Sequence, residues 1–186
     1  MRCLWRLRCE SPKSVLNGTE GGAVRRWPLV SSNEMELSDI YLGLGRDHFD
    51  DVLGTVSMGS LKTFQVFETF KIRTRLSRLN RNRLKSAAPK LWARIEDGDQ
   101  DLAKEIAQGC LVSHMDFVVA ALDFLGIPHD GHGFFEKEAE ATEKLVDGWQ
   151  ANVFGEFKDK YPPALVLLYV NHLDWEMQEP TEVFAG

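Results

Sequence analysis

The sequence predicts an all-α fold: a single compact domain of about five or six helices around a central apolar helix. Two observations favour this class. Apolar residues recur at helical spacing along most of the chain after Met35, and Leu111–Leu125 is almost continuously hydrophobic. No segment shows the short alternating runs, bounded by turn residues, that a sheet needs. With 186 residues, of which 44% are hydrophobic, the chain is long enough for one sizeable core.

Residues 1–34 differ from the rest of the chain. They have no sustained apolar period, and their six Lys and Arg residues outnumber three Asp and Glu residues. The apolar stretch of about 7–15 residues that a secretory signal needs is absent. We interpret 1–34 as a disordered leader or a mis-assigned start, with an organelle transit peptide as a less favoured alternative. The globular domain is predicted over 36–177.

Glycine and proline mark the helices of the first half. Gly43 and Gly45 make the first helix short or broken. A long helix is predicted over 60–85, because its apolar residues form a drifting stripe. Pro89 fits the first turn of a new short helix, where a missing N–H costs nothing, and Gly98 ends that helix.

The central helix is predicted over 99–125. His114 falls on the same apolar face as Cys110, so its side chain is expected to point into the core, where the Cys110 thiol would be inert. Gly126 suits a left-handed cap, and Pro128 bars continuation of the helix. The opposite face is predicted to be wet and carries four acids: Asp101, Glu105, Asp116 and Asp123.

The second half of the chain predicts two more helices. The first covers 136–160, and the pair Pro162-Pro163 separates it from an apolar helix over 164–176. The segment 178–186 is predicted to be a loose tail. The apolar residues of the first of these helices stand four apart: Ala141, Leu145, Trp149, Val153 and Phe157.

Composition limits the function classes. The net charge of −6 favours a soluble protein and argues against general affinity for nucleic acid. Three cysteines provide neither a disulfide framework nor the paired spacing of a zinc site, so we expect a reducing, cytoplasmic location. No apolar run reaches the roughly 18 residues of a membrane span, so no membrane contact is predicted. The motifs of serine hydrolases, phosphate-binding loops and dinucleotide-binding folds are absent from the sequence.

Positive charge is concentrated in one segment. Residues 71–94 contain nine Lys and Arg residues and no acid, whereas the rest of the chain from Met35 carries seven against 25 Asp and Glu residues. We expect these cations to pair with acidic surfaces of this protein, within one subunit or between two copies. Another protein and nucleic acid are the alternative partners. The candidate anion or partner surface consists of Arg73, Arg75, Arg78, Arg81 and Arg83.

Histidines and acids of the second half form a candidate divalent-metal site. Imidazole and carboxylate groups together suit zinc, iron or manganese. The leading interpretation includes no metal or other cofactor: His129 and Asp130 cap the preceding helix and its loop, and His114 is a hydrogen-bonded core residue. The candidate metal ligands are His114, His129, Asp130, His132, His172 and Asp174.

The fragment HDGHGFF, which starts at His129, resembles the HDxGHGPF stretch of the HD-domain metal phosphohydrolases. In that family a histidine, the HD doublet and a later aspartate hold the metal. The resemblance implies that His114, His129, Asp130 and Asp174 are the counterparts, and that the activity would be metal-dependent phosphohydrolysis.

These observations support three hypotheses. The leading one is a non-catalytic helical domain that acts as a protein-interaction module or scaffold, because charge is segregated and no complete catalytic constellation is present. The alternative is a metal-dependent hydrolase that uses the loop His129-Asp130-Gly131-His132. The third is a nucleic-acid-binding module that uses the basic segment 71–94.

Overall fold

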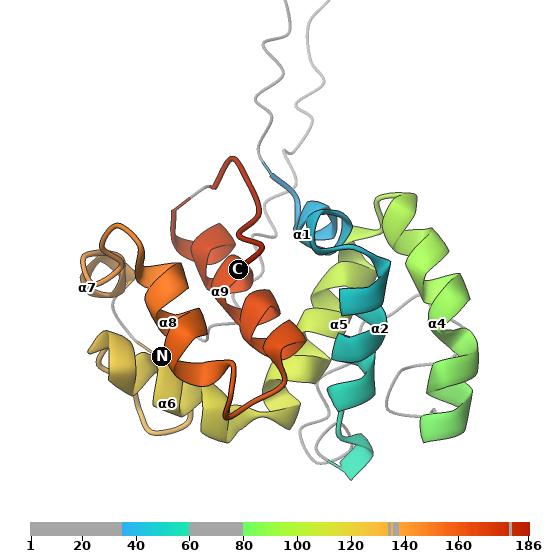
Figure 1. Ribbon diagram of the computed structural model, residues 1–186, viewed down its shortest axis with the longest axis horizontal. Helices are drawn as coiled ribbons and strands as arrows, with labels where there is room; N and C mark the ends of the chain where they lie inside the picture. The colour runs from blue at the N-terminus through green and yellow to red at the C-terminus, as the bar shows by residue number, and fades with distance from the viewer. Residues whose placement is uncertain (1–34, 60–79, 134, 136–137, 179) are drawn as a thin grey trace, which may run out of the picture.

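The computed structural model describes residues 35–59, 80–133, 135, 138–178 and 180–186. Within these ranges the chain is helical, without strands, which confirms the predicted all-α class. The predicted leader 1–34 and most of the predicted helix 60–85 lie outside them. More helices are present than predicted, since the described ranges contain eight: α1 (Leu37–Leu44), α2 (Arg46–Thr55), α4 (Arg81–Glu96), α5 (Gln100–Ser113), α6 (Met115–Leu125), α7 (Glu138–Thr142), α8 (Trp149–Phe157) and α9 (Pro163–Met177) (Figure 1).

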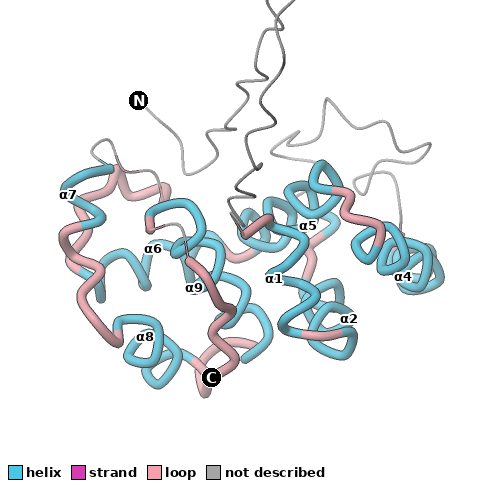
Figure 2. Tube along the Cα trace, turned by 90° about the horizontal axis from the view of Figure 1, so that it is seen from above, coloured by secondary structure: helices cyan, strands magenta, loops and turns pink. Residues whose placement is uncertain are grey.

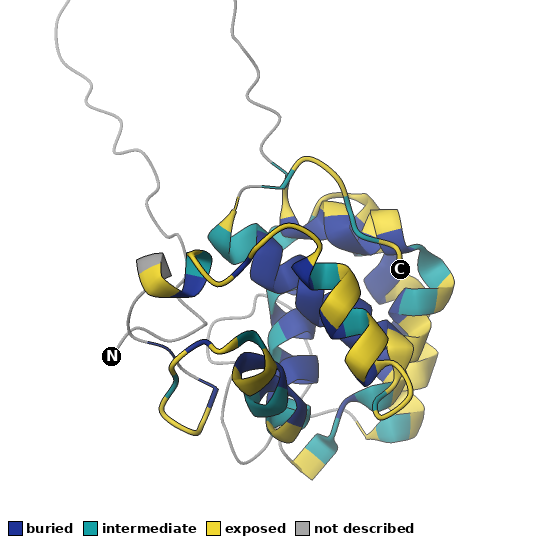
Figure 3. Cartoon of the chain, turned by 60° about the vertical axis from the view of Figure 1, so that its left-hand side comes forward, coloured by how far each residue is buried: buried dark blue, intermediate teal, exposed yellow. Residues whose placement is uncertain are grey.

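Helix α9 forms the centre of the molecule. It contacts α1, α2 and α5 on one side and α7 and α8 on the other, and Figure 1 shows it between these two groups. The whole stretch from Ala164 to Asp174 is buried, so this helix is enclosed all round. Figure 3 shows the buried residues gathered on the inner faces of the helices. The sequence predicted this helix but was wrong to place 99–125 at the centre.

The predicted central helix is in fact two helices. α5 ends at Ser113, α6 begins at Met115, and the two are bent by 85°. His114 lies at the junction with φ −133° and ψ 47°, which is not a helical conformation. Its Nε2 lies 3.2 Å from the carbonyl oxygen of Thr55, and because a carbonyl oxygen only accepts, Nε2 is the donor. His114 therefore turns the chain and ties the junction to the end of α2.

Helix α4 also differs from its prediction. It runs without interruption from Arg81 to Glu96 and contains Pro89, instead of beginning near that proline. Its start is set by Asn80, whose side-chain oxygen accepts a hydrogen bond from the N–H of Arg83 (2.9 Å). The sequence offered Pro89 as a helix start, but the asparagine cap begins the helix two turns earlier.

The segment 136–160, predicted as one helix, is broken. α7 and α8 are separated by a turn that ends at Gly148, which has φ 79°. A glycine tolerates this left-handed conformation without steric cost. The predicted inward residues are nevertheless all buried: Ala141, Leu145, Trp149, Val153 and Phe157.

The predicted end of α6 is confirmed. Gly126 adopts the left-handed conformation with φ 67°. The N–H of Ile127 bonds to the carbonyl oxygen of Leu122, and the N–H of Gly126 bonds to that of Asp123, each at 3.0 Å. Ile127 is buried, so its hydrophobic contact fixes the direction in which the chain leaves the helix.

We expect Gly126→Ala to lower the free energy of unfolding by about 1 kcal/mol, because an L-residue is strained in the left-handed region. No neighbour lies within 4 Å of the added Cβ, so strain and not a clash is tested. Gly155→Ala, in the last turn of α8 and also in open space, is the control and should stabilise the protein slightly. Urea denaturation measures both. Equal effects of the two variants would contradict this account of the cap.

Candidate functional site

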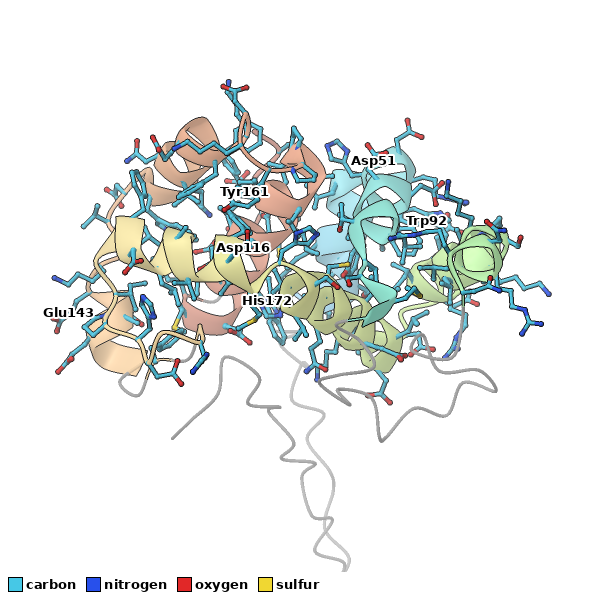
Figure 4. All side chains as sticks on the ribbon, turned by 90° about the horizontal axis from the view of Figure 1, so that it is seen from below. Asp51, Trp92, Asp116, Glu143, Tyr161 and His172 are labelled. Carbon is cyan, nitrogen blue, oxygen red and sulfur yellow. The ribbon has the colours of Figure 1, made fainter. Side chains whose placement is uncertain are left out.

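Helix α4 is the described part of the basic segment, and its inner side is fixed in the core. Trp92 lies between α2 and α4 (Figure 4). Its ring centroid is 5.2 Å from that of Phe49, and the guanidinium of Arg46 lies 5.8 Å above it. Trp92 Nε1 donates a hydrogen bond to Glu96 (2.7 Å). The single acid in the sequence of α4 is thus bound by the helix itself.

Two cations of α4 are used within the protein. Arg81 Nη1 donates to the carbonyl oxygen of Gly54 (2.6 Å) at the end of α2, where carbonyl groups lack helical partners. Arg94 forms an ion pair with Asp99. Asp99 also caps α5, because its Oδ1 accepts from the N–H of Leu102 (3.0 Å). The self-pairing that the sequence suggested is therefore seen at Arg94, whereas Arg81 has a structural role.

Three cations of α4 remain on the surface of the protein. Arg83, Lys85 and Lys90 are exposed, and within the described ranges none of them has a carboxylate at ion-pair distance. Arg83 and Lys90 are two helical turns apart and share one side of the helix, while Lys85 lies on the opposite flank, about 160° from Arg83 around the helix axis. We call these three residues the α4 basic face. Of the anion or partner surface predicted from the sequence, Arg73, Arg75 and Arg78 lie outside the described residues.

The structure does not bring His114 and His129 together. They lie at opposite ends of α6, whose 11 residues span about 16 Å. Two ligands of one metal ion each approach it to about 2.1 Å, so this separation prevents shared coordination. Cys110 is fully buried, as predicted, and burial raises the pKa of its thiol, which keeps it protonated.

The loop after α6 uses its own polar groups. His129 Nδ1 accepts a hydrogen bond from the N–H of Gly131 (3.1 Å), so the proton of the neutral ring is on Nε2, which donates to Asp123 (3.0 Å). Asp130 Oδ1 accepts from the N–H of His132 (2.7 Å), which closes a tight turn. Both ring nitrogens of His129 are therefore engaged, and a metal would have to displace one of these hydrogen bonds.

The last two candidate ligands lie on different sides of α9. His172 is buried near the middle of the molecule (Figure 4), and its Nδ1 is 3.9 Å from Glu176 Oε2. Burial lowers the pKa of His172 from 6.5 to about 4, so the ring is neutral at pH 7 and this contact is no ion pair. Asp174 accepts a hydrogen bond from Gln150 of α8 (3.0 Å), and burial raises its pKa.

Within the described ranges, no group of three or more His, Cys, Asp and Glu side chains is arranged to hold a metal ion. The counterparts that the HD-domain resemblance implies are dispersed over the junction of α5 and α6, the loop after α6, and α9. No family model, curated protein or solved structure matches the chain. The hydrolase hypothesis therefore stays a prediction from the sequence.

Among the described residues, no single helix is both long enough and apolar enough to cross a membrane. Only α5 and α6 taken as a pair, with their bend of 85°, reach the length and apolar composition of a span.

Sequence reasoning missed three buried polar residues. Glu105, predicted on the wet face of the helix, is fully buried, because α5 packs among α1, α2, α4 and α9. Asn171 is 3% exposed and binds the tail of the chain. The hydroxyl of Tyr169 is also buried, without a hydrogen-bond partner in the described part of the chain. An isolated polar residue in an apolar run signals a buried hydrogen bond, but no sequence pattern names the partner.

Proposed function

We propose that this chain is a helical interaction domain that binds an acidic surface of another protein through the α4 basic face. One observation supports the proposal above all. Arg83, Lys85 and Lys90 project from a helix whose inner side is fixed in the core, and within the described ranges no carboxylate neutralises them. Exposed, uncompensated charge of one sign steers an oppositely charged partner and selects against others.

A protein partner is favoured over nucleic acid by the charge of the whole chain. The net charge is −6, so a long phosphate backbone would be repelled by most of the surface. Affinity for a nucleic acid grows with the number of phosphates neutralised, and three cations neutralise few. A short acidic helix or loop can contact the α4 basic face without approaching the acidic remainder.

The test is a triple charge reversal, Arg83→Glu, Lys85→Glu and Lys90→Glu, measured by fluorescence anisotropy with a labelled polyglutamate peptide. We expect binding by the wild-type chain at low salt and a loss of at least about tenfold in the variant, which corresponds to about 1.4 kcal/mol. Binding should weaken as salt is raised, because exposed charge pairs are screened.

The matched control reverses Lys144, Lys158 and Lys160, which are exposed on the α7 and α8 side of the molecule. It changes net charge equally but leaves α4 intact, so it should retain most of the binding. Equal losses in the two variants, or no binding by the wild-type chain at low salt, would contradict the proposal. Tighter binding of a DNA duplex than of polyglutamate would favour the nucleic-acid alternative instead.

A further inference from the structure

One side chain holds both polar backbone groups of Phe184. Asn171 Oδ1 accepts from the N–H of Phe184 (2.7 Å), and Asn171 Nδ2 donates to the carbonyl oxygen of the same residue (2.8 Å). Nδ2 also donates to the carbonyl oxygen of Leu167 (2.8 Å), which fixes the amide within α9. Asn171 is 3% exposed with the tail in place, and departure of the tail would break two of its hydrogen bonds.

Two side chains of the tail pack against helices α1 and α8, and we call each of these contact positions a seat. Val183 lies against Gly43 of α1, where an added Cβ would be only 2.7 Å from Val183 Cγ2. The ring of Phe184 packs edge-on against Phe154 of α8, with centroids 6.1 Å apart. Figures 1 and 2 both show the end of the chain beside α9. This part of the tail is thus packed and not loose as predicted. We call Gly43, Phe154, Leu167 and Asn171 the tail site.

The geometry of the tail site is that of strand recognition. A neighbouring β-strand also pairs with both the N–H and the carbonyl of one residue. Asn171 therefore recognises the backbone of the bound residue, independently of the side chain that this residue carries. The seat at Gly43 accepts a β-branched side chain, and the seat at Phe154 accepts an aromatic one. The hydrogen bonds of Asn171 to the backbone would provide affinity, and the two seats for side chains would provide selectivity, as in sites that bind an added β-strand.

We propose that the tail site is a peptide-recognition site for an extended segment of a partner protein with adjacent β-branched and aromatic residues, and that Val183–Gly186 occupies it in cis. The ligand chemistry is taken from the occupant that the structure shows. The site is built from α1, α8 and α9 and uses no residue of the α4 basic face, so it stands independently of the interaction proposed above.

The tail of the same chain is a strong competitor. Only a few residues link Met177, the last residue of α9, to Val183, and short flexible linkers give effective concentrations of the order of millimolar. A partner segment at micromolar concentration would therefore bind weakly to the closed form. Opening of the tail, by a second contact or by a change in residues 178–182, would expose the site.

The test opens the tail in the chain of 186 residues with the double variant Val183→Gly and Phe184→Gly. The probe is a labelled peptide with the sequence of residues 180–186, Pro-Thr-Glu-Val-Phe-Ala-Gly, followed by fluorescence anisotropy. We expect the double variant to bind the peptide at least about tenfold more tightly than the wild-type chain, because the cis competitor is lost. Circular dichroism confirms that the variant is folded.

Two controls examine the two kinds of contact. A peptide with an N-methyl group on the phenylalanine nitrogen cannot donate to Asn171 and should lose binding at least about tenfold. Gly43→Ala, added to the double variant, should also abolish binding, because the three heavy atoms nearest to the new Cβ all belong to Val183, whose place the valine of the peptide would take. This substitution suits a helix and keeps the fold, so it tests the site even if variants of Asn171 do not fold.

Three outcomes would overturn the inference. The first is a folded double variant that binds the peptide no better than the wild-type chain, which would make the tail a purely structural element. The second is binding that neither the N-methyl group nor Gly43→Ala weakens, which would place the peptide elsewhere. The third is a concentration-dependent wild-type dimer that the double variant does not form, which would identify a second copy, and not a separate partner, as the occupant.

Discussion

Phe117→Ala is expected to lower the free energy of unfolding by about 3–5 kcal/mol, the range typical of a large aromatic side chain removed from a core. Phe117 is fully buried on α6. Its ring centroid lies 5.7 Å from that of Phe157, 4.9 Å from that of Tyr161 and 5.1 Å from that of Tyr169. One ring therefore joins α6 to α8, to the residue before the Pro162-Pro163 break, and to α9.

The loss expected for Phe117→Ala is large because the surrounding helices cannot move to fill the cavity. α9 is buried along most of its length, so the cavity left by the ring has little room to collapse. A loss of this size is a large part of the free energy of unfolding of a whole domain, which is typically about 5–15 kcal/mol. Urea denaturation monitored by circular dichroism measures it, and Phe117→Leu, which fills part of the space, should lose less.

Phe124→Ala is the matched control on the same helix. Phe124 is 48% exposed and contacts Phe157 with centroids 5.7 Å apart. Removal of an exposed ring with one aromatic contact should cost less than about 1 kcal/mol. A cost at Phe124 as large as that at Phe117 would mean that α6 is held mainly by its outer face, and the assignment of α9 as the centre would then be wrong.

The sequence predicted burial better than it predicted helix boundaries. Every apolar residue four apart between Ala141 and Phe157 is buried, although the helix that the spacing implied is broken before Gly148. The bend at His114 was not predicted either, and the reason is the same for both breaks. Apolar periodicity reports which side chains are covered, and a bend that continues to cover them leaves the pattern unchanged. Only the left-handed cap at Gly126 was predicted in detail, because a local rule determines it.

The candidate sites depend on contacts between residues that are distant in the sequence, and these could not be predicted. Charge alone located a basic segment, but only the structure shows that Arg81 is bound to α2 and that Arg83 is exposed. Glu105 was predicted to lie on the surface, but α5 packs among α1, α2, α4 and α9, and the residue is fully buried. Asn171 was not singled out in the predicted apolar helix, and its partner, Phe184, follows the predicted end of the domain.

The stability of the protein is expected to fall by about 3 kcal/mol as pH decreases from about 6.5 to about 4, through His172 alone. Burial lowers the pKa of His172 in the folded chain from 6.5 to about 4. Between these values the unfolded chain binds a proton that the folded chain does not. Stability is therefore complete above the unfolded pKa and is lost as pH falls toward the folded pKa.

Two neighbouring carboxyl groups must be separated from this effect. Glu176 lies 3.9 Å from His172 Nδ1 and would favour a charged ring, but burial outweighs it. Burial raises the pKa of Asp174, so its contribution has the opposite sign: it adds stability as pH falls through that raised value. A pH profile of the wild-type chain alone would mix these terms.

His172→Gln separates these contributions, because it replaces the titrating ring by a neutral amide side chain of similar size while Asp174 and Glu176 remain. The free energy of unfolding is measured by urea denaturation at intervals between pH 4 and pH 7 in both proteins. The wild-type slope should exceed that of the variant between about pH 4 and pH 6.5, and the curves should run parallel above that range. Parallel curves over the whole range would show that His172 is protonated equally in both states and that the ring is not enclosed as described.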